Sequence, residues 1–444
     1  MGYKKVFSSA RFQTRAQNTF NLNPREKRIV IGSRSTEPTR SAYLGKVIEQ
    51  GKTGSLLDYE VHCDVSFPHV IGIFGSRGSG KSFDLGVFLE EIFRDAGRDC
   101  GIVFDVQDQF WTLGFAPSED ISGDAQHLDD LAKWGLEPSA VANVAVLIPR
   151  GSDTPVPNAV PFSLSPNQLS EADWLALLDL ERFTPMGQAL LTLLDQTGPL
   201  TPTQLVRAVA GAGLTAKFQQ STVDALTWRL GSLADVGVID DDGLDIDELL
   251  QPNTLSVILM RNLSDGVRGL VVGVVSRLVA DRMGREKQRR KVAMRTDPTA
   301  AQDAVLAARL WMVLDEAHVL VPSDGATAAT EPMIDYVKRG RDAGLSLIFA
   351  TQQPSAVNTK MISQVDLTIT HALAFETDLA AAAARMPARA PNDYEISNEK
   401  ANGIGDVLRS LAPGEAFVAD TSSGRGFLIK VRPRLSAHGG VSPV

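Results

Sequence analysis

The segment IGIFGSRGSGKSF, residues 71–83, is the strongest indication of the fold in this sequence. From Gly75 to Ser82 it matches the pattern G-x-x-x-x-G-K-[ST], in which a glycine-rich loop holds the phosphates of a nucleoside triphosphate. The apolar residues before this loop predict a buried strand, and the segment SFDLGVFLEEIFRDAG after it predicts an amphipathic helix that ends at Gly97. This order of elements predicts an α/β fold with a nucleotide site.

The loop itself supplies most of the expected nucleotide contacts. Its three glycines allow the backbone N–H groups to face the phosphates at the start of the following helix. We expect Lys81 to contact the β- and γ-phosphates and the Ser82 hydroxyl to bind Mg²⁺, so the expected cofactors are ATP and Mg²⁺. Arg77 is at a variable position, where it either faces solvent or contacts phosphate. The expected contacts are Gly75, Ser76, Arg77, Gly78, Ser79, Gly80, Lys81, Ser82 and Phe83.

The segment LWMVLDEAH, residues 310–318, supplies the second half of the predicted site. Its apolar residues predict a buried strand that ends at Asp315, which we expect to bind Mg²⁺ beside the phosphate loop. Glu316 follows directly and can activate the attacking water as a general base. His318 invites comparison with the DEAH helicases, but their later arginine motifs are not evident here, and a structural or signalling role is the simpler interpretation.

A third segment, VKRGRDAGLSLIFATQQPSAV at residues 337–357, predicts a strand next to the one that ends at Asp315. Gln352 at the end of this strand can contact the γ-phosphate or the attacking water. Arg339 and Arg341 precede the strand, where they either reach the site of a neighbouring subunit or form a solvated basic turn. An arginine supplied by a neighbour typically accelerates phosphoryl transfer ~10³–10⁵-fold.

Changes of pattern along the chain predict four regions. Short alternating runs near the start predict a small β element, similar to a short β-barrel, behind an N-terminal arm. Four helical patterns predict a helical insertion, either a plain bundle or a small winged-helix unit. Short apolar strands that alternate with helices elsewhere predict a mainly parallel sheet covered on both faces. The expected boundaries are 1–66 for the arm and β element, 67–164 for the first part of the core, 165–250 for the insertion and 251–444 for the second part of the core with the C-terminal tail.

Composition limits the possible functions. The 444 residues carry a net charge of −9, so contact with nucleic acid requires a local basic patch. The two cysteines, Cys63 and Cys100, have neither metal-ligand nor disulfide-framework spacing, which suits a reducing cytoplasm. The sequence contains no run of about 18 apolar residues, so we expect no membrane-spanning helix. The basic N-terminal segment predicts a flexible or self-associating arm, with an organelle transit peptide as the alternative.

The segment DRMGREKQRRKVAMRTD, residues 281–297, is the candidate DNA contact. We expect a local basic loop that binds phosphates without reading sequence, or else a solvated or disordered charged stretch. The segment has little aromatic interleaving, which argues against stacking on single-stranded bases. The candidate contacts are Arg285, Lys287, Arg289, Arg290 and Lys291.

These motifs occur in one order together with the tail GEAFVADTSSGRGFLIKVRPRLSAHGG, and they resemble the HerA branch of the HerA–FtsK motor ATPases over residues 66–438. The resemblance implies a RecA-like core and a hexameric ring that translocates double-stranded DNA with a nuclease or another effector, in DNA end processing or phage defence. The stretch GIVFDVQDQF is similar to an aspartate-containing segment of that family, which implies that Asp105 lies near the nucleotide. By motif position, the resemblance implies catalytic or metal-binding roles for Lys81, Ser82, Asp315, Glu316, Gln352 and either Arg341 or Arg339.

Two classes of function stay open at this point. One is a hexameric DNA-translocating ATPase, and the other is an ATPase scaffold or switch that assembles an effector enzyme without processive translocation. The region before the phosphate loop is short for the N-terminal β-barrel of the family, which gives the second class some weight. An ABC-type ATPase is a weak third hypothesis, because NLSDGVRGL at 262–270 only faintly matches the signature of that family and lies well before the Asp315 strand.

Overall fold

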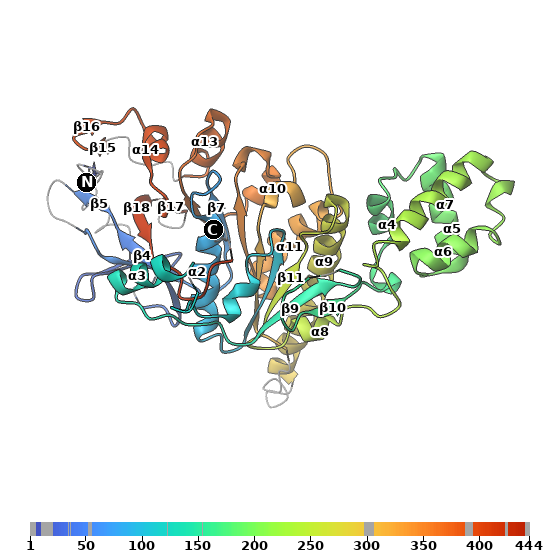
Figure 1. Cartoon of the computed structure of the whole chain (residues 1–444), viewed down its shortest axis with the longest axis horizontal. Coiled ribbons are helices and arrows are strands. Elements are labelled where there is room, and N and C mark those ends of the chain that lie inside the picture. Colours follow the sequence, from blue (N-terminus) through green and yellow to red (C-terminus); the bar gives the residue numbers. More distant parts are fainter. Residues whose placement is uncertain are drawn as a thin grey trace.

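The structure is a computed structural model that describes residues 6–9, 21–33, 35, 37–51, 56–121, 123–152, 154–296, 306–386, 394–421 and 425–439. Within these residues the chain forms one sheet of fourteen strands and a second sheet of four. Figure 1 shows the large sheet in the middle of the molecule, with helices on both sides. The predicted α/β fold with a mainly parallel sheet is confirmed.

The central part of the large sheet is parallel. Its strands follow the order β10-β9-β11-β8-β12-β13-β7-β14, and every neighbouring pair runs in the same direction. The middle strands are buried on both faces, which explains why they read as continuous apolar runs in the sequence. These strands are β7 (Val70–Phe74), β8 (Asp99–Asp105), β9 (Val144–Pro149), β10 (Val160–Phe162), β11 (Leu255–Leu259), β12 (Arg309–Leu314), β13 (Leu345–Thr351) and β14 (Leu367–Thr370).

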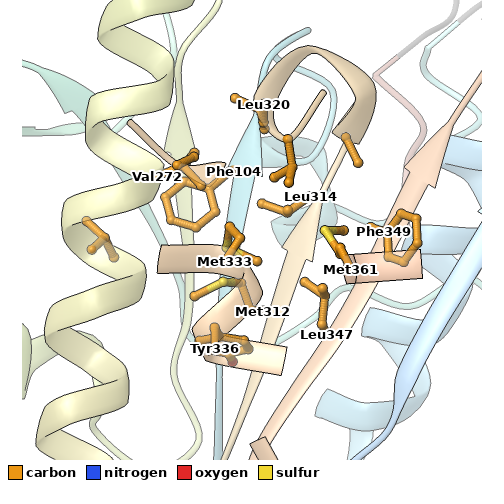
Figure 2. Packing of buried hydrophobic residues seen from close by; sticks show 14 of the residues in the cluster. Phe104, Val272, Met312, Leu314, Leu320, Met333, Tyr336, Leu347, Phe349 and Met361 are labelled. Carbon is orange, nitrogen blue, oxygen red and sulfur yellow. The ribbon is translucent and has the colours of Figure 1, made fainter. Parts of the chain in front are cut away.

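Helices cover both faces of this sheet. Each strand sends alternate side chains to opposite faces, so one strand contributes to the core on both sides. On β12, Met312 and Leu314 belong to the core beneath α9 (Asp265–Thr296) and α11 (Thr330–Ala343). Figure 2 shows these two side chains packed among residues from β8, α9, α11 and β13. Trp311 and Val313 point to the other face and join the core under α2 (Lys81–Arg94).

The chain continues the sheet beyond β14 with strands that are mostly antiparallel. These are β17 (Glu415–Asp420), β18 (Arg425–Val431), β4 (Ser41–Val47), β6 (Glu60–Asp64), β3 (Arg28–Ile31) and β2 (Asn21–Asn23). The small sheet combines strands from the N-terminal and C-terminal parts of the chain. These are β1 (Phe7–Ser9), β5 (Glu49–Gly51), β15 (Tyr394–Ile396) and β16 (Glu399–Lys400). Of the described N-terminal strands, β2, β3, β4 and β6 extend the core sheet and β1 and β5 pair in the small sheet, so they do not form the barrel-like element that we expected over 1–66.

Four helices form a separate cluster at one end of the molecule, opposite the N-terminal strands (Figure 1). Ser170, Thr184 and Thr201 are the N-caps of three of them, each with a side chain that accepts a backbone N–H of the following turn. Asp173 in this cluster binds Arg277 of α9 at 2.7 Å, which ties the cluster to the core. The helices are α4 (Glu171–Leu177), α5 (Pro185–Thr197), α6 (Pro202–Val209) and α7 (Gln220–Ala234).

One element was predicted wrongly. The basic segment expected as a loop is the last part of α9, which is 32 residues long and ends at Thr296. Its Arg, Lys, Gln, Met and Ala residues are strong helix formers. Glu286 also pairs with Arg289 at 3.2 Å and with Arg290 at 3.0 Å, at the spacings that stabilise a helix.

The remaining helices are short and surround the sheet edges. They are α3 (Ala125–Trp134), α8 (Ile246–Leu249), α10 (Ala317–Leu320), α12 (Thr359–Ile362), α13 (Glu376–Ala383) and α14 (Ile404–Ser410). Among the residues that the structure describes, no helix has both the length and the apolar character that crossing a bilayer requires.

Candidate nucleotide site

Three motifs that are far apart in the sequence meet at one edge of the sheet. Strands β7, β12 and β13 are parallel, so the phosphate loop, Asp315 and Gln352 all follow the carboxyl ends of neighbouring strands. A cavity of about 1200 Å³ opens at this edge. Its lining includes Arg77, Gly78, Gly80, Lys81, Ser82, Phe83, Gln107, Glu316 and Gln352.

The phosphate loop is held in a conformation that requires glycine. Gly78 and Gly80 have φ values of 75° and 121°, which L-residues with a side chain rarely adopt. A Cβ on Gly75 would lie 2.8 Å from the Cβ of His371, so a larger residue would displace the loop from β14. The N–H of Ser76 donates to the carbonyl of Ala372 at 2.8 Å and fixes the other side of the loop.

Lys81 lies inside the loop. Its Nζ donates to the carbonyl oxygen of Ser76 at 3.0 Å, and its side chain is buried. Burial lowers the pKa of Lys81, while the charges of Glu316 and Asp315 act in the opposite direction. The ammonium group is therefore surrounded by oxygen atoms at the position where phosphate oxygens can replace a carbonyl.

Asp315 and Ser82 form an oxygen-rich pair next to Lys81. The Ser82 hydroxyl donates to Oδ2 of Asp315 at 3.2 Å, and the backbone N–H of Glu316 donates to Oδ1 at 3.0 Å. Burial and the neighbouring Glu316 raise the pKa of Asp315 to about 6. A hydroxyl and a carboxylate are the hard ligands that Mg²⁺ prefers, so this pair fits the ion that the motif implies.

Glu316 has an unusual backbone and a polar surrounding. Its φ of 52° and ψ of 49° are left-handed, a conformation that costs a non-glycine residue about 1–3 kcal/mol and that concentrates at functional sites. The amide groups of Gln352 and Gln107 both donate to its Oε1, the latter at 3.3 Å. Its buried Oε2 has no hydrogen-bond partner among the described residues. One carboxylate oxygen is thus held in place while the other stays available for a water molecule.

His318 lies next to the Glu316 carboxylate. Its Nδ1 lies 3.2 Å from the hydroxyl of Thr351 and 3.5 Å from Oε2 of Glu316. Burial lowers the pKa of His318, so the ring is mostly neutral at pH 7. The arrangement links the ends of β12 and β13, in agreement with a structural role for this histidine.

Asp105 ends β8 but does not line the cavity. Its carboxylate accepts the backbone N–H groups of Gln107 at 3.1 Å and Phe110 at 2.7 Å, and burial raises its pKa to about 7. The loop that it braces carries Gln107 to Glu316. The sequence pattern therefore located a loop at the site, but the residues of this loop that line the cavity are Val106, Gln107 and Gln109, and Gln107 is the one that binds Glu316.

The structure places the two candidate arginine fingers away from this cavity. Arg341 is in the last turn of α11 and Arg339 is just before that turn, so both precede β13 and lie at the amino edge of the sheet. Arg339 pairs with Asp335 at 3.2 Å and Arg341 with Asp366 at 3.6 Å. Their side chains are 67% and 79% exposed, so neither pair removes them from solvent.

The candidate DNA contacts lie at this same amino edge. Arg290 donates to the carbonyl of Leu306, just before β12 begins. Together with Arg289 it is partly neutralised by Glu286, whereas Arg285 and Lys291 are exposed.

Two buried clusters near the phosphate loop were missed from the sequence. In the first, His371 lies 2.8 Å from Oδ2 of Asp84, and its other ring nitrogen lies 3.0 Å from the carbonyl of Glu415. This pair fastens the start of α2 to β14 and β17, directly under the loop. The histidine that directly follows the strand LTIT was a possible signal in the sequence, but its partner Asp84 is 287 residues away.

The second cluster holds the C-terminal tail against α2. Arg432 pairs with Glu90 and Glu91, each at 3.0 Å, and both acids are buried. Burial by itself raises the pKa of Glu90, but the charges of Arg434 and Arg432 and its hydrogen bonds lower it below its usual range. The tail then brings His438 to the cavity. The arginine pair of RPRL was a possible signal for this buried contact.

Comparisons with known proteins agree with this geometry. The model of the HerA helicase central domain matches residues 42–279, and that of the HerA-like C-terminal domain matches residues 305–434. No curated protein sequence matches the chain.

Among solved structures, VirB4 of Thermoanaerobacter pseudethanolicus is similar at a TM-score of 0.54 and 15% identity, over 89% of this chain and 97% of that one. The bacterial conjugative coupling protein TrwB is similar at 0.52 and 12%, over 86% and 88%. TrwB in complex with ADP and Mg²⁺ is similar at 0.51 and 13%, over 84% and 87%. These likenesses show a shared P-loop fold. The family models cover most of the chain, which therefore belongs to the HerA family of P-loop ATPases.

Proposed function

We propose that the chain binds Mg²⁺-ATP at the carboxyl edge of its sheet and couples hydrolysis to the movement of double-stranded DNA by a ring of six subunits. The observation that carries this proposal is the meeting of Lys81, Glu316 and Gln352 in one cavity, with buried Asp315 joined to it through the hydroxyl of Ser82. These residues supply a phosphate-binding cation, a metal ligand, a general base and a polar side chain at the position of the attacking water.

The chain's own groups divide the work of hydrolysis. Lys81 exchanges its bond to Ser76 for bonds to the phosphates, and Glu316 takes the proton of the attacking water through its unpartnered Oε2. Gln352 holds Oε1 and so orients the carboxylate. Ser82 and Asp315 would hold Mg²⁺, which would neutralise charge on the phosphate oxygens.

A ring is proposed because one protomer does not complete the site. Arg339 and Arg341 lie at the amino edge, so neither can reach the cavity of its own chain. Both are exposed and can enter the cavity of a neighbour whose amino edge faces it. Six subunits follow from membership of the family, not from any contact within this protomer.

DNA contact is proposed for the core and not for the helical insertion. Residues 165–250 contain thirteen Asp and Glu but only four Lys and Arg. The net charge of this segment is therefore −9, the same as the net charge of the whole chain. The rest of the chain is therefore balanced in charge. The exposed basic residues at the end of α9 are its best candidates for phosphate contact, because binding of a DNA backbone requires positive charge.

The test is the ATPase rate of the purified particle with and without duplex DNA, combined with its mass in the presence of ATP. We expect a particle of six chains whose hydrolysis rises with duplex DNA and falls with added salt. Hydrolysis without any response to DNA at low salt would contradict translocation. A monomeric particle with full activity would contradict the shared site.

A second candidate is a scaffold or switch that controls an effector enzyme, such as a nuclease, and the insertion favours it. Trp228 and Phe183 are 80% and 89% exposed in this acidic cluster, and exposed aromatic residues are typical of protein interfaces. The Glu316→Gln variant separates the two candidates, because it is expected to keep ATP binding and to lose hydrolysis. Full effector function with this variant would support the switch, and loss of function would support the motor.

A further inference from the structure

The order of strands indicates which end of the cavity faces the γ-phosphate and which end faces the nucleoside. Glu316 and Gln352 follow β12 and β13 and mark the end where the γ-phosphate is attacked. The phosphate loop follows β7, and beyond it the sheet continues in the order β14, β17, β18, β4. The nucleoside, which is bound to the α-phosphate, must therefore extend from the loop toward β17, β18 and β4.

The wall at that end is built from residues that no motif predicted. The position of a Cβ on Gly80 is 3.5 Å from the backbone nitrogen of Gly414, so the phosphate loop rests on the start of β17. Lys430 of β18 pairs in register with Lys46 of β4. The ammonium group of Lys46 lies 5.0 Å from the centre of the Trp134 ring, and Trp134 lines the cavity together with Gly414 and Lys430. A continuous wall thus runs from the phosphate loop to this tryptophan.

Trp134 is poorly explained by packing. It is the last residue of α3, and Leu131 is the one residue of that helix that is buried. The Trp134 ring is only partly covered, and it belongs to neither hydrophobic core. The cation of Lys46 holds it from the ring face. The ring is thus fixed in orientation while part of its surface borders the cavity.

We propose that Trp134 is the base-stacking residue of this site and holds the purine ring of the bound nucleoside triphosphate. This inference rests on the proposed nucleotide binding and adds the contact that recognises the base. An aromatic ring that borders a phosphate-binding cavity at the nucleoside end offers a flat apolar surface to a base, and base–aromatic stacking is a strong, geometrically tolerant contact.

The test measures the binding of Mg²⁺-ATP and of inorganic tripolyphosphate, which has the phosphates but no base, to the full chain. Trp134→Ala is expected to weaken ATP binding about 5- to 150-fold and to leave tripolyphosphate binding unchanged. Trp134→Phe, which keeps an aromatic face, is expected to retain most of the affinity for ATP. Trp228→Ala is the matched control, because Trp228 is 80% exposed on α7 and far from the cavity in sequence and in the fold.

Tryptophan fluorescence gives an independent readout. ATP, but not tripolyphosphate, is expected to quench the emission of the wild-type protein, and Trp134→Phe is expected to lose this quenching. The melting temperature of each variant shows whether it is folded, and Trp134→Phe keeps the test valid if Trp134→Ala is not.

Three results would overturn the proposal. They are unchanged ATP affinity in Trp134→Ala, an equal loss of affinity for both ligands, and ATP quenching that persists in Trp134→Phe. Failure of the wild-type protein to bind ATP at all would instead overturn the proposed function, and this inference with it. The two failures are therefore distinguished by the wild-type titration alone.

Discussion

The two edges of the parallel sheet hold charged residues in opposite environments. At the carboxyl edge, Lys81, Asp315 and Glu316 are buried; Lys81 is held within its own loop, and Asp315 and Glu316 are held by hydrogen bonds from other segments. At the amino edge, Arg339 and Arg341 are exposed; Arg339 pairs with the exposed Asp335, and Arg341 lies 3.6 Å from the largely covered Asp366. Surface pairs of this kind contribute about 0–1 kcal/mol, so these arginines can leave their partners at little cost. One edge is preorganised, and the other is free to engage a second molecule.

The largest effect is expected from the amino edge. Arg341→Ala should reduce ATP turnover of the assembled particle ~10³–10⁵-fold, because the charge on the transferring phosphoryl group loses a cation supplied by the neighbour. The fold of the protomer should not change, since this side chain is 79% exposed. Steady-state hydrolysis and circular dichroism measure the two quantities.

Arg339→Ala is the matched control for this variant, because Arg339 is two residues away on the same helix. Loss of turnover in Arg339→Ala, with full activity in Arg341→Ala, would assign the contact to Arg339. Full activity in both variants would show that the amino edge takes no part in hydrolysis.

A smaller effect is expected at the carboxyl edge. Lys81→Ala should weaken ATP binding about 10- to 150-fold, because hydrogen bonds between an ammonium group and phosphate oxygens are lost. Calorimetric titration of ATP measures the change. Lys217→Ala, at an exposed position of the helical insertion, should bind ATP like the wild type. Equal affinities of Lys81→Ala and the wild type would remove the phosphate loop from the site.

The dependence on pH tests the same edge. Asp315 has a pKa raised to about 6, and its protonated form cannot bind a cation. Mg²⁺ affinity should therefore fall up to about tenfold per pH unit below 6 and level off above it. Titration of Mg²⁺ into the ADP-bound protein at several pH values shows the trend, which Asp315→Asn should abolish. A flat profile across pH 6 would show that Asp315 does not bind the ion.

The smallest effect is expected from the end of α9. Reversal of the charges of Arg285, Lys287 and Lys291 should lower the slope of log affinity for duplex DNA against log salt by about 3 and leave basal hydrolysis unchanged. Reversal of Arg207 and Lys217 in the insertion is the control, since it changes charge far from the amino edge. An unchanged slope in the α9 variant would identify these residues as a solvated surface.

Much of the carboxyl edge could be predicted from the sequence, because each motif combines an apolar strand with the polar residues that follow it. The positions of Ser82, Asp315 and Gln352 needed only the rule that parallel strands present their carboxyl ends together. The amino edge was harder to predict. A dense run of positive charge resembles a loop, and only the pairing of Glu286 with Arg289 and Arg290 reveals a continuing helix.

Other parts could not be predicted because their partners are remote in sequence. Arg432 and Glu90 are 342 residues apart, yet both are buried in one ion pair. Trp134 ends a short helix in a stretch without any motif, and at the cavity it meets Lys46 of β4, a strand that pairs with β18. Periodicity in the sequence predicts a helix or a strand, but it does not show which distant helix or strand packs against it.

The helix α9 extends from one edge of the sheet to the other. Its 32 residues correspond to a rod about 48 Å long. Near its first turn, Arg268 donates to the carbonyls of Met260 and Arg261, and Arg261 borders the nucleotide cavity. A tilt of about 5° at this end would move the other end by about 4 Å, close to the 3.4 Å rise of one base pair. If the chain moves duplex DNA as proposed, a small rotation at the nucleotide would therefore match one step along the duplex.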